Sequence, residues 1–110
     1  MIYMLKKAGS DLQAKANDGK TFLMYAATTR NVNLVNYLLN HGAPIDAQDN
    51  EGWTALMRAV DVDNKEIVIA LLQRGAKVSC RSKADETAVM IAKRRAGSGV
   101  IEAIENHKDR

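Results

Sequence analysis

The hydrophobic and polar positions of this chain recur at one constant interval, which is the spacing between Thr21, Thr54 and Thr87. Segments 19–26, 52–59 and 85–92 each carry threonine at the third position, leucine or valine followed by methionine at the fifth and sixth, and alanine at the eighth. An interval of this length indicates supersecondary units that cannot bury an apolar face alone, so that neighbouring units must stack. The pattern therefore predicts a row of similar units.

A short helix is predicted to begin each unit. Thr21, Thr54 and Thr87 each precede a stretch in which apolar residues recur at spacings of three and four. A threonine in this place can accept hydrogen bonds from the first free backbone N–H groups of a helix. We therefore expect these threonines to cap the first helices.

A second helix and a projecting loop are predicted to complete each unit. The apolar stripe of residues 34–39 ends at Gly42, and its equivalent in the next unit, 67–72, ends at Gly75. Glycine suits the left-handed backbone that closes many helices, because it has no Cβ. The polar stretches 43–52 and 76–85 are predicted to project between units as fingers.

The most regular unit lies within residues 52–79. Its first helix is written Gly-Trp-Thr-Ala-Leu-Met-Arg-Ala-Val, its second contains Val-Ile-Ala-Leu-Leu, and it closes with Gly-Ala-Lys-Val-Ser. These segments resemble the unit of the ankyrin-repeat family, whose motifs are Gly-x-Thr-Pro-Leu-His-x-Ala-Ala, Val-x-x-Leu-Leu and Gly-Ala-x-Val-Asn. The resemblance implies an all-α ankyrin-repeat solenoid of stacked helix-turn-helix units joined by β-hairpin-like fingers.

The same resemblance implies one domain over residues 1–110. We expect two full repeats, 16–48 and 49–81, between a partial repeat, 1–15, and a capping repeat, 82–110. The partial repeat covers only a second helix. It is either a truncated cap or the continuation of a longer array, and we favour the longer array.

Polar residues indicate a cap at the C-terminal end of the stack. Lys93, Glu105 and Lys108 stand where the other repeats have apolar residues or glycine. An end repeat needs a polar outer face, because nothing of the stack covers it. We expect these side chains to face water.

Three methionines depart from the family pattern. Met24, Met57 and Met90 stand where the ankyrin unit has histidine. A thioether cannot replace the hydrogen bonds of histidine, but it fills irregular gaps between apolar side chains. We therefore expect an apolar, adaptable seam between repeats that contains all three methionines.

Composition is typical of a single globular domain. The chain has 110 residues, of which 46% are hydrophobic, and one cysteine, Cys80. One cysteine excludes a disulfide within the chain and suggests a reducing compartment. No apolar stretch is long enough to cross a bilayer, and the N-terminus does not have the order of a signal peptide. We expect an intracellular, cytoplasmic protein that has no membrane contact.

The net charge of +3 is distributed unevenly. Basic side chains exceed acidic ones by three in residues 1–43 and again in 77–110, whereas acidic side chains exceed basic ones by three in 44–76. A nucleic-acid-binding protein is expected to carry a continuous basic stripe with aromatic residues for stacking. Because the acidic middle interrupts such a stripe, we expect no nucleic acid as a partner.

The sequence contains no set of residues that indicates catalysis or metal binding. The two histidines, His41 and His107, and the one cysteine do not occur at ligand spacing, so no zinc site of the ordinary kind can be assembled. Four loop aspartates lack the spacing of a calcium loop and are interpreted as solvated turn residues: Asp46, Asp49, Asp61 and Asp63. We expect no enzyme activity, no catalytic residue, no cofactor and no metal.

Recognition through a surface remains, and the resemblance indicates which surface. In ankyrin stacks the concave side, formed by the fingers and first helices, usually holds a protein. Carried over position by position, the predicted partner-binding residues are Lys20, Thr28, Asn50, Glu51, Trp53, Asp61, Val62, Lys83, Glu86, Arg94 and Arg95. The expected function is a non-catalytic protein-protein interaction module, as an adaptor or a segment of a larger protein.

Trp53 is the predicted anchor of this surface, since tryptophan is enriched among interface hot spots. The alternative is that its ring packs on a neighbouring finger, because single exposed aromatic residues are ordinary. Arg94 and Arg95, together with Asp61, are predicted to steer a partner that carries both signs of charge.

A different function stays open beside this one. The repeats could form a structural spacer, or a domain that self-associates through its N-terminal end. Met1, Ile2, Met4 and Leu5 favour some cover at that end, because contiguous apolar residues are rarely left exposed.

Overall fold

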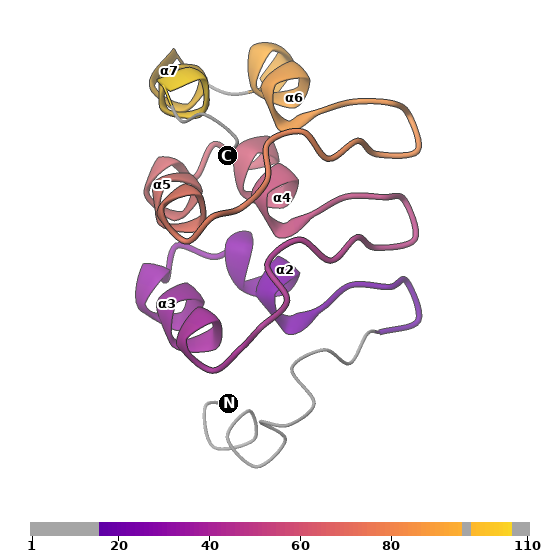
Figure 1. Ribbon diagram of the computed structural model, residues 1–110, viewed down its shortest axis with the longest axis vertical. Coiled ribbons are helices and arrows are strands. Elements are labelled where there is room, and N and C mark those ends of the chain that lie inside the picture. The colour runs from indigo at the N-terminus through magenta and orange to yellow at the C-terminus, as the bar shows by residue number, and fades with distance from the viewer. Residues whose placement is uncertain (1–15, 96–97, 107–110) are drawn as a thin grey trace.

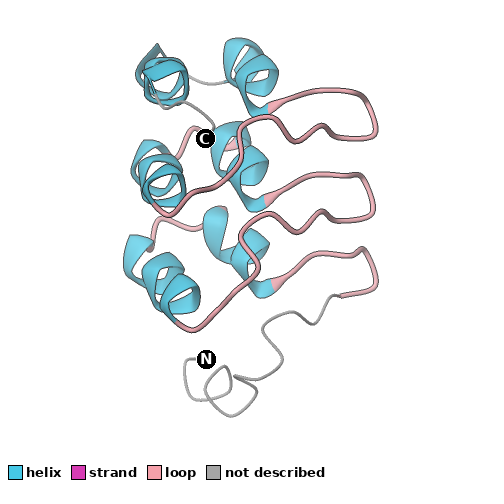
Figure 2. Ribbon diagram, in the orientation of Figure 1, coloured by secondary structure: helices cyan, strands magenta, loops and turns pink. Residues whose placement is uncertain are grey.

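Helices and loops make up the described part of the chain. The structure is a computed structural model, and it describes residues 16–95 and 98–106. The helices are α2 (Phe22–Ala27), α3 (Val32–Asn40), α4 (Ala55–Asp61), α5 (Lys65–Gln73), α6 (Ala88–Arg95) and α7 (Ser98–Asn106). Within these residues no β-strand occurs, as Figure 2 shows. The all-α prediction is confirmed for this part of the chain.

The helices lie in two layers (Figure 1). The first helices α2, α4 and α6 form one layer, and the second helices α3, α5 and α7 form the other, with neighbours in contact within each layer. Each first helix also contacts the second helix that follows it. The first helices begin at Phe22, Ala55 and Ala88, which are equivalent positions of the sequence pattern, so the spatial repeat follows the sequence repeat.

The predicted threonine caps are present at all three first helices. The Thr21 hydroxyl accepts a hydrogen bond from the Met24 N–H at 3.3 Å, and Thr54 accepts from Met57 at the same distance. Thr87 accepts from the N–H of Met90 at 3.4 Å. These bonds satisfy donors that the helix itself leaves without partners, which fixes where each helix begins.

Gly42 and Gly75 end the second helices in the predicted left-handed conformation. Their φ angles are +88° and +89°, a region that strains residues with a Cβ. The following N–H groups, of Ala43 and Ala76, each donate to a helix carbonyl at 3.0 Å. The chain therefore leaves each second helix at a defined angle and returns toward the fingers.

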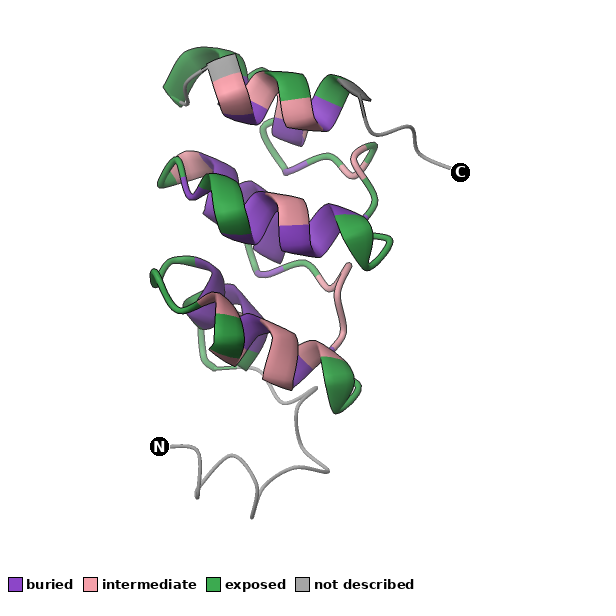
Figure 3. Ribbon diagram, turned by 90° about the vertical axis from the view of Figure 1, so that its left-hand side faces the viewer, coloured by how far each residue is buried: buried purple, intermediate pink, exposed green. Residues whose placement is uncertain are grey.

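The core lies between the two layers and continues through all three helix pairs. Leu23, Leu56, Leu71 and Ile91 are each exposed by 1% or less. Figure 3 shows how burial varies along the second-helix layer: α5, with a neighbour on either side, buries five of its nine residues, whereas α3 buries two. Because a buried leucine-sized side chain contributes about 2 kcal/mol, each pair depends on its neighbours for stability.

Three fingers project from the first-helix layer (Figure 1), and they are turns that stop short of β-hairpins. We name them by the described residues: the first finger is 16–20, the second 46–53 and the third 79–86. In the second finger the Asp49 N–H donates to the Trp53 carbonyl, and the Gly52 N–H donates to the Asp49 carbonyl, both at 2.9 Å. These two bonds close the turn but are too few for a strand, so the hairpin-like form is limited to the tip of the finger.

Backbone hydrogen bonds also join successive fingers. The Asn50 N–H donates to the Asp18 carbonyl at 3.0 Å, and the Lys83 N–H donates to the Glu51 carbonyl at 2.9 Å. The Asn50 side chain adds a bond to the Asn17 carbonyl at 3.0 Å. The fingers are therefore held at a fixed spacing, and side chains at their tips form one surface.

The predicted methionine seam is correct for two residues and wrong for the third. Met24 and Met57 are 1% exposed, but Met90 is 45% exposed. Helix α2, which carries the buried Met24, contacts α4 of the pair that follows it. The equivalent side of α6 has no described pair against it, which leaves Met90 open.

The two ends of the stack are only partly described. Lys93 and Glu105 are exposed, as expected of a cap. The prediction for Lys108 lies outside the described residues, and so do the half-repeat at 1–15 and the self-association through its apolar residues.

Asn64 links two helix pairs from a buried position. Its side chain amide donates to the carbonyl oxygens of Ala27, at 3.4 Å, and of Thr29, while the residue is only 3% exposed. We expect Asn64→Ala to lower the free energy of unfolding by about 1–3 kcal/mol, because both carbonyls lose a buried donor. Urea unfolding followed by circular dichroism measures the change.

Asn33 provides the matched control for this variant. It is an exposed asparagine in α3, and Asn33→Ala is expected to change the free energy of unfolding by less than about 0.5 kcal/mol. Equal effects of the two substitutions would show that the inter-pair hydrogen bonds do not contribute to stability.

Candidate functional site

The surface formed by the fingers and the first helices carries the predicted partner-binding residues. We call this surface the finger face. Seven of these residues are exposed, namely Thr28, Asn50, Glu51, Val62, Lys83, Arg94 and Arg95, and four are half-buried, namely Lys20, Trp53, Asp61 and Glu86. All eleven lie in the fingers, in the first helices or directly beside these helices. Figure 1 shows the fingers and first helices together on one side of the second-helix layer.

The two predicted partner-binding residues that α6 contributes, Arg94 and Arg95, are paired within the chain. Arg94 contacts the carboxylate of Glu86, and Arg95 Nε lies 3.0 Å from Asp61 Oδ1 in the preceding pair. Such surface pairs contribute at most about 1 kcal/mol each. The opposite charges within each pair also neutralise one another, so the electric field of Arg94, Arg95 and Asp61 extends over a shorter distance than that of free charges.

The most buried ion pair on the finger face joins Asp49 to Arg58. Arg58 Nη2 contacts Asp49 Oδ2, and the Asp49 side chain is only 1% exposed. Two backbone N–H groups, of Glu51 at 2.8 Å and of Trp53 at 2.9 Å, donate to the other carboxylate oxygen. The interpretation of Asp49 as a solvated turn residue is therefore wrong: the carboxylate is buried and organises the second finger.

Charge and hydrogen bonding together set the protonation of this carboxylate. Burial by itself raises the pKa of Asp49, but the hydrogen bonds from Arg58, Trp53 and Glu51 and the positive charge of Arg58 outweigh it. The pKa of Asp49 consequently lies below its ordinary value. Asp49 is ionised at neutral pH and remains an acceptor for all three donors.

Arg58 is a central residue of the finger face that the sequence analysis did not single out. Besides Asp49 it reaches Glu51, with 3.6 Å between Nη2 and Oε1, and its guanidinium carbon lies 4.6 Å from the centre of the Trp53 ring. Its Nε is buried and has no hydrogen-bond partner. Arg58 thus ties the second finger to α4 and stacks on the predicted anchor. The sequence held one signal for Arg58. The equivalent positions of the other repeats hold Tyr25 and Ile91, so an arginine here departs from the repeat pattern.

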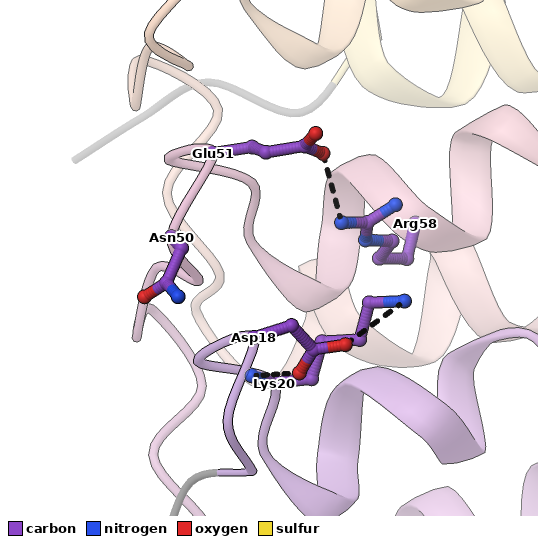
Figure 4. A pocket seen from close by; sticks show the side chains of 5 residues that line it. All are labelled: Asp18, Lys20, Asn50, Glu51 and Arg58. Atoms are coloured by element: carbon purple, nitrogen blue, oxygen red, sulfur yellow. Dashed lines mark hydrogen bonds and ion pairs between the residues drawn. The ribbon is translucent and has the colours of Figure 1, made fainter.

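Two hollows flank the second finger. The first, shown in Figure 4, has a volume of about 300 Å³ and is lined by Asp18, Lys20, Asn50, Glu51 and Arg58. The second has a volume of about 400 Å³ and is lined by Glu51, Trp53, Lys83 and Ala84. Glu51 lines both hollows, the first of which has only polar and charged residues in its lining, while the second also has Trp53 and Ala84.

Trp53 is packed and accessible at the same time. It lies against the core, stacks under Arg58 and still lines the second hollow. The anchor role and the packing of the ring on a neighbouring finger both stay predictions for this residue.

Residues 16–95 and 98–106 offer neither a metal site nor a membrane-crossing helix. No three histidine, cysteine, aspartate or glutamate residues among them are grouped so that they could hold a metal ion. None of the helices described combines the length and apolar character needed to cross a membrane.

Comparison with known proteins identifies the family. The family model described as ankyrin repeats, in three copies, matches residues 1–82. A search of curated proteins gives no match. The matched region covers most of the chain and includes the first two described helix pairs with their fingers. The chain belongs to the ankyrin-repeat family.

Proposed function

We propose that this chain is a non-catalytic protein-interaction module that binds its protein partner on the finger face. Ankyrin repeats are generally protein-protein interaction modules and are typically non-catalytic, which supports the function class. In this proposal the chain is a short solenoid with repeats 16–48 and 49–81 and a capping repeat 82–110. The second helices supply packing, and the fingers and first helices supply contact.

The observation that carries the proposal is the second finger. It holds an indole, Trp53, that lines the second hollow, and this indole is fixed by Arg58, which contacts the buried Asp49. A rigid aromatic side chain provides a large contact area while little conformational entropy is lost on binding. Packing does not require a tryptophan here, because the equivalent positions of the other repeats hold Lys20 and Glu86.

The proposal predicts that Trp53→Ala loses partner binding. With the intact chain immobilised and a protein extract of the source organism applied, we expect the variant to retain less than about a thirtieth of the wild-type affinity, as a hot-spot residue requires. Quantified capture of the protein that the wild type retains measures this loss.

Tyr37→Ala is the control, since Tyr37 is a half-buried aromatic residue of α3 on the opposite layer. It should capture the partner as the wild type does, and circular dichroism should show both variants folded. Undiminished capture by a folded Trp53→Ala variant would contradict binding through the finger face.

A further inference from the structure

The structure points to the chemistry of the group that the second finger receives. We propose, resting on the proposed function, that a basic side chain of the partner enters the second hollow, with its aliphatic stem on Trp53 and Ala84 and its charged end at Glu51. The partner is thus a protein that presents an exposed arginine or lysine to the finger face.

Glu51 is the carboxylate that remains available around the second finger. In the first hollow Lys20 has Asp18 as its partner, with 3.7 Å between Nζ and Oδ2, and Arg58 has the buried Asp49. Glu51 reaches Arg58 only at 3.6 Å and its side chain is 75% exposed. Figure 4, which draws the first hollow, shows the Glu51 carboxylate extended toward Arg58. Because Asp49 already neutralises Arg58, Glu51 can turn to a second cation at little cost.

The second hollow fits an amphipathic side chain. Trp53 and Ala84 give it an apolar wall, and Glu51 gives it a negative edge. Arg58 stacks on the Trp53 ring but does not line this hollow, so a different part of the indole faces it. Arginine and lysine carry a long apolar stem with a positive end, and they pack their stems on aromatic rings. An acidic side chain is too short to cover the same wall and still reach a charge.

Lys83 is a cation that also lines this hollow, and it has no ion pair among the described residues. Its side chain is exposed, so it can turn into water when a basic group enters. The repeat around the hollow is acidic, with six acidic and three basic side chains in residues 44–76. This charge balance favours a basic side chain of the partner over an acidic one.

Peptide titration of the intact chain tests the proposal. The probes are three acetylated and amidated alanine pentapeptides whose central residue is arginine, its neutral analogue citrulline or glutamate. Trp53 is the only tryptophan, so its fluorescence reports on the hollow directly. We expect a saturable change with the arginine peptide, at least fivefold weaker binding of the citrulline peptide, and the weakest binding of the glutamate peptide.

Two charge variants complete the test. Glu51→Gln should weaken the arginine peptide about tenfold, the loss expected when a charge-assisted hydrogen bond is removed, whereas Lys83→Gln should bind it at least as tightly as the wild type. Both residues are exposed, so neither variant should disturb folding. Equal binding of arginine and citrulline, tighter binding of glutamate, no saturable change, or no effect of Glu51→Gln would each overturn the proposal.

Failure of this inference can be distinguished from failure of the proposed function. If Trp53→Ala abolishes partner capture while Glu51→Gln leaves both capture and peptide binding unchanged, the finger face binds a partner without this basic contact, and only the present inference falls. If Trp53→Ala leaves capture intact, the proposed function falls, and the peptide titration still decides the chemistry of the hollow.

Discussion

Arg58→Ala is expected to lower the free energy of unfolding by about 3–5 kcal/mol, the range for removing one partner of a buried ion pair. The variant leaves the Asp49 carboxylate, 1% exposed, with only the N–H groups of Glu51 and Trp53 as donors. Trp53 loses the guanidinium stacked on its ring at the same time. Chemical unfolding of wild type and variant at neutral pH measures the loss.

Arg94→Ala is the matched control for this prediction. Arg94 is also an arginine of a first helix paired with a finger carboxylate, that of Glu86, but its side chain is 50% exposed. Its removal should cost less than about 1 kcal/mol, since solvent screens the pair. Similar losses for Arg58→Ala and Arg94→Ala would contradict a special role for the buried pair.

The buried pair of Asp49 and Arg58 also predicts that the stability difference between wild type and Arg58→Ala depends on pH. Because the pKa of Asp49 is depressed in the folded chain, the carboxylate stabilises the fold above its ordinary pKa of about 3.9, and this stabilisation is lost as pH falls through the depressed value. The stability gap between wild type and Arg58→Ala should therefore be full at pH 7 and shrink from about pH 4 downward. A gap that stays constant down to pH 2 would show that Asp49 is not the group that Arg58 stabilises.

Gly52→Ala is expected to cost about 2–4 kcal/mol, the sum of a left-handed backbone and a steric clash. Gly52 has a φ of +80°, and a Cβ there would lie 2.8 Å from the Lys83 nitrogen and 3.0 Å from the Ser82 Cα. That nitrogen donates the hydrogen bond that joins the second and third fingers. The substitution should thus separate the fingers as well as strain the turn, and thermal unfolding measures the combined effect.

Gly75→Ala separates the two contributions. Its φ is +89°, but a Cβ there would meet nothing within 4 Å, so only the backbone cost of about 1–2 kcal/mol is expected. If Gly52→Ala is no more destabilising than Gly75→Ala, the close approach of the second and third fingers does not constrain the fold.

Local signals allowed much of the fold to be predicted from the sequence. The threonine caps and the glycines at helix ends depend only on a short stretch of chain. Each of these signals also occurs more than once, because it recurs from repeat to repeat. Met90 could not be placed in the same way, because its sequence context matches that of Met24 and Met57. Its exposure depends on whether another helix pair lies against it.

The candidate site was less predictable, for a physical reason. Trp53 and Glu51 could be predicted on the finger face from the resemblance to the ankyrin repeat, carried over position by position. The contact between Asp49 and Arg58, by contrast, depends on how the second finger folds back onto α4. A loop aspartate has the same sequence signature whether it is solvated or buried. The charge balance of a surface likewise reveals nothing about which charges pair, as Arg94 with Glu86 and Arg95 with Asp61 show.

Hydrogen exchange of the intact chain, free and bound to the protein that it captures, tests the central claim most directly. If the repeats pack on one another through their helices and bind the partner on the finger face, amide exchange should become slower on binding in the second and third fingers and in α4. Exchange in α3, α5 and α7 should remain unchanged. Protection confined to these second helices, with the fingers exchanging as fast as in the free chain, would contradict the account.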